Sequence, residues 1–170
     1  EDPSVSARRM DAAVDYILAL QESAGLDIVS DGEYRRRSYI GIIADVADGF
    51  ELERKDGLWW HTVVAPLEVA RPGLAAEEAT YLRTRTDRRI KVCLPSPYLL
   101  GQRMWDAERS RAAYPTREDF MQALVPILRG ELEELIAAGA NVVQFDDPHL
   151  CLFVDDQVRS RYEDPDREID

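Results

Sequence analysis

The sequence predicts an α/β fold with a parallel sheet, because three short apolar runs alternate with segments of helical periodicity. The runs cover residues 26–30, 90–94 and 141–145. A polar or turn-forming segment follows each of them: Asp31-Gly32-Glu33, Pro95-Ser96-Pro97 and Asp146-Asp147-Pro148. Since ligands bind at the carboxyl ends of parallel strands in α/β folds, we expect a site where these segments meet.

Helices are expected before and between the apolar runs. Residues 4–24 keep apolar side chains on one face, and Gly25 suits the left-handed residue that ends a helix. Further helices are expected over residues 38–49, 75–85, 97–105 and 116–139. Thr116 and Asp119 resemble a capping box at the start of the last helix, and Pro126 is expected to kink it.

A β-hairpin is expected in the middle of the chain. Residues 50–54 and 58–64 are rich in aromatic and β-branched side chains. They flank Asp56-Gly57, a dipeptide that favours the tight turns of hairpins. The sequence therefore predicts a hairpin inserted between the first two strands of the parallel sheet.

Composition limits the classes of protein to which the chain can belong. It has 170 residues, 33 acidic and 21 basic, and a formal net charge of −12. We expect one domain over residues 1–154 and a loosely held acidic tail over residues 155–170. The charge argues against nucleic acids and anionic membranes as partners. Because there is no apolar run of roughly 20 residues, no signal-like start and no disulfide scaffold, a cytoplasmic location is expected.

Glu33 and Asp146 are the leading candidates for chemistry, since Glu33 lies three residues after one apolar run and Asp146 directly follows another. If their strands are near neighbours, the two carboxylates converge. Such a pair can hold an ammonium group, bind a hard metal, or divide into an acid and a base. The alternative is structural: Asp31 would cap the next helix, and Asp146 would close a turn before Pro148.

His149 and Cys151 are residue types that bind zinc, but a tetrahedral site needs two more protein ligands, or one and a water. The remaining residues of these types are His61 and Cys93. Cys93 lies among apolar residues of a predicted strand, where inert buried thiols are usual. The expectation is therefore no metal site within the chain, with His149 and Cys151 as the alternative.

Basic and aromatic clusters remain open to two interpretations. Arg35, Arg36 and Arg37 follow Glu33 closely, and they can meet an anionic substrate or neutralise nearby carboxylates. Trp59-Trp60 and Trp105 can stack on a planar ligand or join the core. The glycine-rich phosphate-binding motifs and the nucleophile elbow of serine hydrolases are absent from the sequence, which argues against those two classes.

Three segments together resemble the cobalamin-independent methionine synthases and their relatives. Residues 24–33 (AGLDIVSDGE), with Arg36, are similar to the family motif G-x-D-x-x-(S/T)-(D/H)-G-E-x-x-R. Residues 94–97 (LPSP) are similar to its TGP turn. Residues 139–148 (GANVVQFDDP) are similar to its G-x-x-x-(I/V)-Q-I-D-E-P strand, the most specific of the three. Order and spacing agree over residues 10–155.

The resemblance implies a (β/α)8 barrel, of which this chain covers about the second to fifth strands with an inserted hairpin. It implies zinc-dependent transfer of a methyl group from a 5-methyltetrahydrofolate-type donor to the thiol of homocysteine, giving methionine. By position, Glu33 and Asp146 match the two carboxylates that bind the substrate's amino group, and Arg36 is also assigned to substrate binding. The partners implied are small molecules and the remainder of the barrel.

The sequence departs from the family pattern in several places. The zinc ligands His-x-Cys, Glu and Cys of the late strands are not found, and His149-x-Cys151 follows the Asp-Asp-Pro turn too closely to align with them. Arg37-Ser38-Tyr39 replaces Asn-Asp-Met, and Asp147 stands where Glu is usual. Three alternatives therefore stay open: an alkyltransferase for another thiol such as coenzyme M, a non-catalytic, self-associating partial barrel without metal, and a decarboxylase that uses the arginines.

Overall fold

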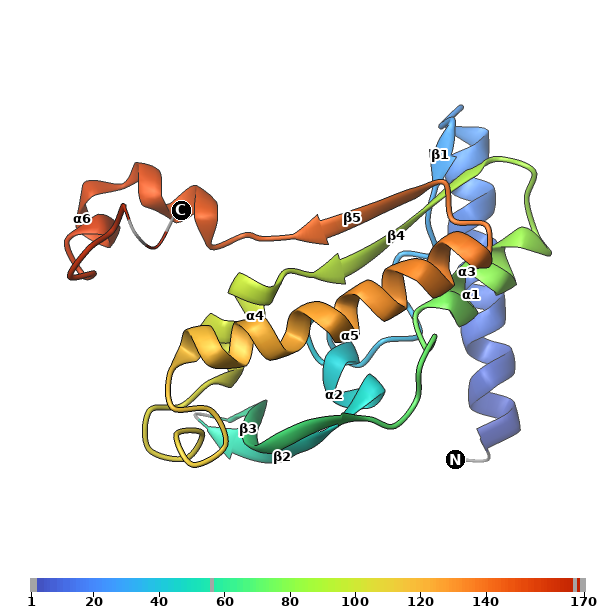
Figure 1. Ribbon diagram of the computed structural model, residues 1–170. Helices are drawn as coiled ribbons and strands as arrows, with labels where there is room; N and C mark the ends of the chain where they lie inside the picture. Colours follow the sequence, from blue (N-terminus) through green and yellow to red (C-terminus); the bar gives the residue numbers. More distant parts are fainter. Residues whose placement is uncertain (1–2, 56, 167, 169–170) are drawn as a thin grey trace.

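The computed structural model describes residues 3–55, 57–166 and 168, which form both helices and strands (Figure 1). In chain order they are α1 (Pro3–Ser23), β1 (Ile28–Val29), α2 (Ile42–Val46), β2 (Ala47–Lys55), β3 (Leu58–Val69), α3 (Ala76–Arg83), β4 (Arg89–Pro95), α4 (Pro97–Met104), α5 (Arg117–Ala137), β5 (Val142–Asp146), the 3-10 helix η1 (Leu150–Val154) and α6 (Asp156–Arg159).

The three predicted apolar runs form one parallel sheet in the order β1-β4-β5. Ile28 of β1 pairs with Arg89 at the start of β4, and Pro95 at the end of β4 pairs with Asp146 at the end of β5. The predicted α/β fold is therefore confirmed. Because β4 lies in the centre, the segments that follow β1 and β5 reach the same edge of the sheet from either side of it.

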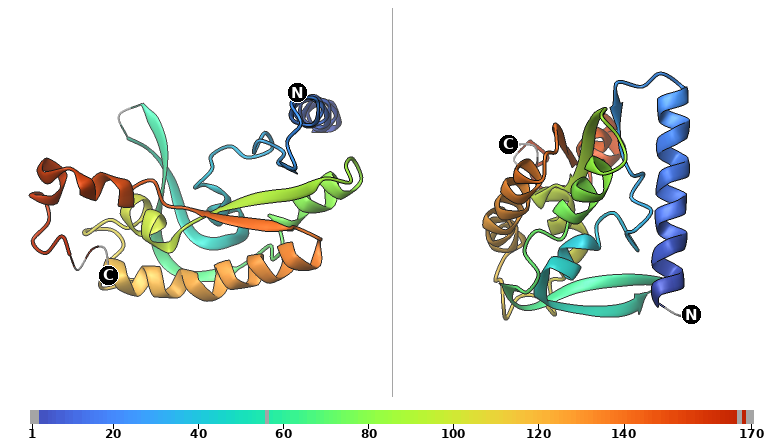
Figure 2. Two further views of the ribbon diagram at one scale, coloured as in Figure 1. Left: turned by 90° about the horizontal axis from the view of Figure 1, so that it is seen from above. Right: turned by 90° about the vertical axis from the view of Figure 1, so that its right-hand side faces the viewer.

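Helix α5 covers one face of this sheet along β4 and β5 (Figure 2). Alternate side chains of β4 join one hydrophobic core with those of α5: Ile90, Val92, Leu94, Phe120, Leu124, Leu128 and Leu135. The predicted capping box is present, since the Thr116 hydroxyl accepts a hydrogen bond from the Asp119 backbone N–H and the Asp119 carboxylate accepts one from Thr116. The helix continues through Pro126 to Ala137.

The predicted hairpin is present but longer than expected. Strands β2 and β3 pair antiparallel from Ala47 opposite Val69 to the turn, and they form a separate two-stranded sheet. Its register shifts between Asp48 and Phe50, where Gly49 has a left-handed φ of 113°. The predicted turn residue Asp56 lies outside the described residues, whereas its neighbour Gly57 has a φ of 83°.

Three expectations about the elements are wrong. The helix expected over residues 38–49 is shortened to α2, because Ala47 is already extended and pairs as the first residue of β2. The strand expected over residues 26–30 forms ladder pairs only at Ile28–Val29. The described residues supply three parallel strands and not about four, because the chain after β5 turns into η1 and α6.

The segment expected to be a loosely held tail contains structure in its described part. It holds the short helix α6, and Glu168 accepts hydrogen bonds from the Arg117 guanidinium at 2.6 and 2.7 Å. The Tyr98 hydroxyl donates to the same carboxylate at 3.2 Å. These contacts join the end of the described chain to α4 and α5.

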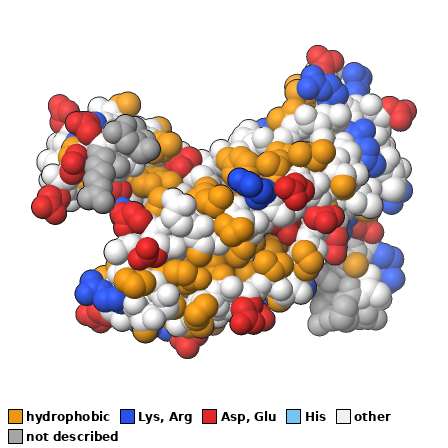
Figure 3. Space-filling model, viewed as in Figure 1, with side chains coloured by type: hydrophobic (Ala, Val, Ile, Leu, Met, Phe, Trp, Pro, Cys, Tyr) orange, Lys and Arg blue, Asp and Glu red, His pale blue; other side chains and the backbone are white. Residues whose placement is uncertain are grey.

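The parallel sheet is open, with β1 and β5 as its edge strands. Apolar side chains show on the face that carries α5 and β5 (Figure 3), and Ile136 and Phe145 of these elements are 61% and 43% exposed. A strand edge with exposed apolar neighbours favours contact with further protein. Among the described residues, no helix combines the length and apolarity needed to cross a membrane.

Candidate functional site

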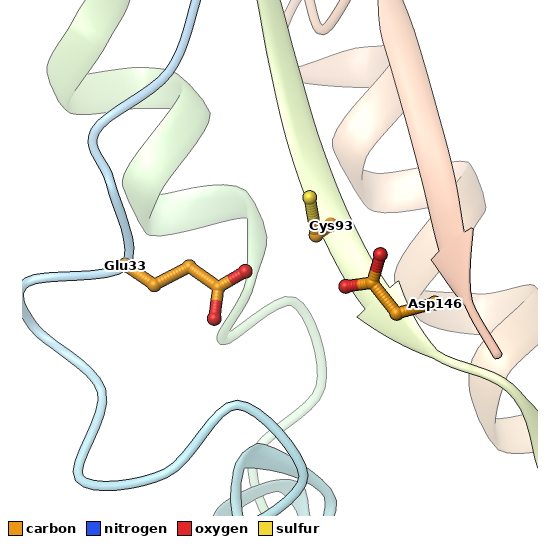
Figure 4. Close-up of side chains that lie close together, drawn as sticks. All are labelled: Glu33, Cys93 and Asp146. Carbon is orange, nitrogen blue, oxygen red and sulfur yellow. The ribbon is translucent and has the colours of Figure 1, made fainter. Parts of the chain in front are cut away.

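The carboxyl ends of the strands bring Glu33, Cys93 and Asp146 together, as Figure 4 shows. The carboxylate oxygens of Glu33 and Asp146 and the Sγ atom of Cys93 all lie within 4.8 Å of one another, and each side chain is half-buried. The predicted convergence of Glu33 and Asp146 is thus confirmed. Their role in binding a ligand remains a prediction.

A tight turn after β1 presents Glu33. Gly32 and Glu33 both have left-handed φ angles, 70° and 59°. The Asp31 carboxylate accepts a hydrogen bond from the Glu33 backbone N–H at 2.9 Å, and the Glu33 carbonyl accepts one from the Arg36 N–H at 3.0 Å. Asp31, which is buried, therefore stabilises this turn and caps no helix. A left-handed non-glycine residue beside a candidate site is the kind of strain found at functional positions.

Asp146, the last residue of β5, is fixed through its backbone and oriented through its side chain. Its carbonyl accepts a hydrogen bond from the Ser96 N–H at 3.0 Å. The Gln144 amide donates to its carboxylate, and the Lys91 ammonium donates to Gln144 at 2.9 Å. The turn before Pro148 relies instead on Asp147, whose carboxylate accepts a hydrogen bond from the Ser96 hydroxyl at 2.5 Å. Asp146 thus keeps its carboxylate directed towards Cys93 and Glu33.

The sequence predicts that Cys93 is an inert thiol buried in the core, and the placement in the core is wrong. It lies on the face of β4 opposite to Ile90, Val92 and Leu94, and its side chain points towards the two carboxylates. Burial, reinforced by the charges of Asp146 and Glu33, raises the pKa of the Cys93 thiol to about 11. The thiol therefore keeps its proton at neutral pH. Lys91 lies two residues before Cys93 and therefore on the same face of β4. This charged residue is the signal in the sequence that the face is polar.

Arg36 is buried beside the cluster and is held by a residue that the sequence analysis did not identify. Its guanidinium donates to the two carboxylate oxygens of Glu78 on α3, at 2.7 and 2.8 Å, and to the Cys93 carbonyl at 2.8 Å. The Glu33 carboxylate lies 3.7 Å away. Burial raises the pKa of Glu78 against the opposing effect of Arg36. Burial would lower the pKa of Arg36, but Glu78, Glu33 and Asp31 together raise it.

The other two arginines have different surroundings. Arg35 forms an ion pair with Asp11 of α1 at 2.6 Å and stacks on the Tyr81 ring at 4.2 Å. It therefore neutralises a nearby carboxylate, as one of the two interpretations held. Arg37 lines a pocket.

That pocket, of about 590 Å³, lies between the hairpin, α4 and the loop after β1. The two predicted tryptophans line it: Trp59 is 68% exposed, and the Arg103 guanidinium stacks on Trp60 at 4.2 Å. Tyr39 lines both this pocket and the adjoining hollow that contains Asp146. Trp105 instead packs against the core and donates to the Tyr114 carbonyl at 3.0 Å.

The zinc ligands implied by the resemblance are not assembled by the described residues. His149 stands at the N-cap position of η1 without a side-chain capping hydrogen bond, Cys151 is exposed, and the Cys151 thiol donates to the Pro148 carbonyl at 3.0 Å. Within the described ranges, the one group of three metal-binding residue types is Glu33, Cys93 and Asp146, and it contains neither of these two residues. The described residues therefore do not fit the implied zinc centre.

Known proteins similar to this chain are methionine synthases. The protein from Sulfurisphaera tokodaii is 26% identical over 146 residues, which cover 82% of this chain and 42% of that protein. The protein from Pyrococcus abyssi is 31% identical over 147 residues, covering 82% and 41%. The 5-methyltetrahydropteroyltriglutamate–homocysteine methyltransferase of Salmonella arizonae is 28% identical over 137 residues, covering 76% and 18%. The chain thus spans less than half the length of these relatives.

Solved structures agree with the sequence relatives. A B12-independent methionine synthase from Shewanella sp. W3-18-1, in complex with selenomethionine, superposes with a TM-score of 0.72 and 30% identity, covering 89% of this chain and 45% of that one. A structure from Listeria monocytogenes, at 22% identity and a TM-score of 0.61, supports the fold. Residues 2–166 match the family described as cobalamin-independent synthase, catalytic domain. The chain therefore belongs to the cobalamin-independent methionine synthase family.

Proposed function

We propose that this chain is part of the catalytic barrel of a methyltransferase that converts homocysteine to methionine, and that it supplies the part of the active site that binds the amino group. The observation that carries this proposal is the convergence of Glu33 and Asp146 at the edge of the parallel sheet. Family membership and the partial coverage of longer relatives support the (β/α)8 barrel as the complete fold.

The electrostatics of the cluster favour a cationic ligand group. Glu33 and Asp146 place two carboxylates around one half-buried space, and an ammonium ion there would be attracted to both. Cys93 keeps its proton at neutral pH, so it adds no third negative charge. The Shewanella relative was solved with selenomethionine, an amino acid with the same α-amino group as homocysteine and methionine.

The reaction then requires that the amino acid be held while its sulfur meets the methyl donor. The sulfur of homocysteine gives up its proton and attacks the methyl carbon, the bond from that carbon to the donor nitrogen breaks, and that nitrogen takes up a proton, so that no net proton is gained or lost. Glu33 and Asp146 orient the substrate, and this lowers the barrier to methyl transfer because the reacting atoms are fixed in position. The metal that the family resemblance implies would be held by residues beyond those described here.

A folate-type methyl donor has a flat ring system, and the pocket lined by Trp59 and Trp60 fits such a group. Tyr39 connects this pocket to the hollow that contains Asp146, so a donor in the pocket would lie next to the amino acid. We therefore assign the donor to the pocket.

The test is calorimetric titration of the chain with homocysteine and with the analogue that lacks the amino group. Asp146→Asn and Glu33→Gln are each expected to weaken homocysteine binding about tenfold or more, equivalent to about 1.4 kcal/mol, and to leave the analogue unaffected. Equal affinity of wild type and both variants for homocysteine would overturn the proposal. Preference of the wild type for the analogue would favour a thiol without an amino group, such as coenzyme M.

A non-catalytic, self-associating partial barrel is the second candidate, favoured by the open edges of β1 and β5. Sedimentation velocity distinguishes the two states: a sedimentation coefficient that rises with concentration indicates self-association. The decarboxylase alternative loses support, because the Arg36 guanidinium is already bound by Glu78 and by the Cys93 carbonyl.

A further inference from the structure

We propose that Glu78 is a positioning residue of the amino-acid site, because it holds the Arg36 guanidinium away from Glu33 and so keeps the Glu33 carboxylate available to a cationic ligand. This inference rests on the proposed function, and it assigns a task to a residue of α3 that does not itself belong to the cluster of Glu33, Cys93 and Asp146.

The first step is the geometry of the guanidinium. Glu78 accepts from Nε and Nη2 of Arg36 in a two-pronged arrangement, and the Cys93 carbonyl accepts from Nη2 as well. The distance from Arg36 Nη1 to Glu33 Oε2 is 3.7 Å. This exceeds the roughly 2.7–3.2 Å of a hydrogen bond between nitrogen and oxygen. Arg36 is thus directly bonded to Glu78 and only near to Glu33.

The second step is burial. The side chains of Arg36 and Glu78 are 4% and 6% exposed, so water cannot replace a missing partner. A buried guanidinium without its carboxylate is strongly unfavourable and recruits the nearest anion. Glu33 already lies within 4 Å of it. Asp31 has one oxygen bonded to the Glu33 backbone N–H, and its other oxygen, buried without a hydrogen-bond partner, is the competing acceptor.

The third step is the consequence for the ligand. If Arg36 bonds directly to Glu33, the guanidinium occupies the position of the ligand's ammonium group and cancels the charge that attracts it. Asp146 alone then remains to bind the amino group. Glu78 therefore determines whether the site has one available carboxylate or two, although it does not contact the ligand.

The experiment compares Glu78→Gln with Glu77→Gln. Both residues are on α3 and both substitutions remove one negative charge, but Glu77 is exposed and Glu78 is buried. Glu78→Gln is expected to weaken homocysteine binding about tenfold while affinity for the analogue without the amino group stays unchanged. Glu77→Gln is expected to bind both ligands like the wild type. A Glu78→Gln variant that binds homocysteine as the wild type does would overturn the inference.

The double variant Arg36→Gln/Glu78→Gln separates positioning from folding, since it removes the guanidinium together with its partner. The inference replaces the substrate-binding role implied for Arg36 with a structural one, since its guanidinium is bonded to Glu78 and to the Cys93 carbonyl. Homocysteine affinity is therefore expected to return towards that of the wild type, whereas continued loss of preference for the amino group would contradict the proposal. If Glu78→Gln alone does not fold, the double variant still tests the inference, because loss of preference for the amino group in it would overturn the proposal.

Two further measurements keep this inference distinct from the proposed function. If Glu33→Gln leaves homocysteine binding unchanged, the proposed function fails. If Glu33→Gln weakens binding and Glu78→Gln does not, the positioning role alone fails. A crystal structure of ligand-free Glu78→Gln should show the 3.7 Å separation of Arg36 and Glu33 shortened to a hydrogen bond, and an unchanged separation would count against the role of Glu78.

Discussion

Glu33 and Asp146 approach one another from opposite sides of strand β4, and their carboxylate oxygens lie within 4.8 Å. The pairing of β4 with β1 and β5 sets this separation, because Pro95 and Asp146 are register partners and Glu33 follows β1 by a short turn. Cys93, on the central strand, lies beside both carboxylates. The geometry of the site therefore depends on the parallel sheet, which places Glu33, Cys93 and Asp146 next to one another.

The two thiols are expected to differ in reactivity. Cys151 is exposed, whereas Cys93 is half-buried and its pKa is raised to about 11. Because the thiolate is the reactive form, iodoacetamide at pH 8 should modify Cys151 quickly and Cys93 slowly. Peptide mass spectrometry of a time course measures both rates, with Cys151→Ser as the control that isolates Cys93. Comparable rates for the two cysteines would contradict the electrostatics derived for the site.

Glu131 of α5 is expected to be important for stability. Its buried carboxylate accepts hydrogen bonds from the Gly73 and Ala75 backbone N–H groups, at 2.6 and 3.0 Å. Glu131→Ala leaves both donors without an acceptor, which should cost about 2–4 kcal/mol of the free energy of unfolding. Urea denaturation measures this loss of stability. Glu133→Ala, at an exposed position of the same helix, is the matched control. The interpretation is wrong if the two variants are equally stable.

The sequence alone was sufficient to predict the parallel sheet and the meeting of Glu33 and Asp146, because both features follow from local patterns: apolar runs, and the residues that end them. It was insufficient for Glu78 and Cys93. Glu78 is 42 residues from Arg36 in the chain, so their pairing depends on how α3 packs. The orientation of Cys93 depends on which face of β4 α5 covers. The pairing of Arg36 with Glu78 is tertiary and no local pattern encodes it, whereas Lys91, two residues before Cys93, is a local sign that this face of β4 is polar.

Gly49 is expected to tolerate no side chain. Its φ is 113°, and an added Cβ would lie 2.9 Å from the Ala65 carbonyl oxygen and 3.0 Å from that of Pro66. Gly49→Ala should therefore destabilise the protein by more than about 1 kcal/mol. Gly130→Ala is the opposite case, because Gly130 lies within α5 with nothing within 4 Å, and alanine should stabilise the helix by about 0.5–1 kcal/mol. Thermal denaturation of both variants should show melting temperatures shifted in opposite directions.

The pH dependence of stability should carry a contribution from Cys93. Burial and the two carboxylates raise its pKa from 9.0 to about 11, so the folded protein binds this proton more tightly than the unfolded chain does. The stabilising contribution is complete below pH 9 and is lost as the pH rises through about 11. Serine at this position does not titrate in that range. Urea midpoints measured from pH 8 to 11 should fall more steeply for the wild type than for Cys93→Ser, while tyrosine and lysine titration affects both proteins alike. Parallel curves would show that the thiol titrates with the same pKa in the folded and unfolded states, and that the carboxylates of Glu33 and Asp146 exert no field on it.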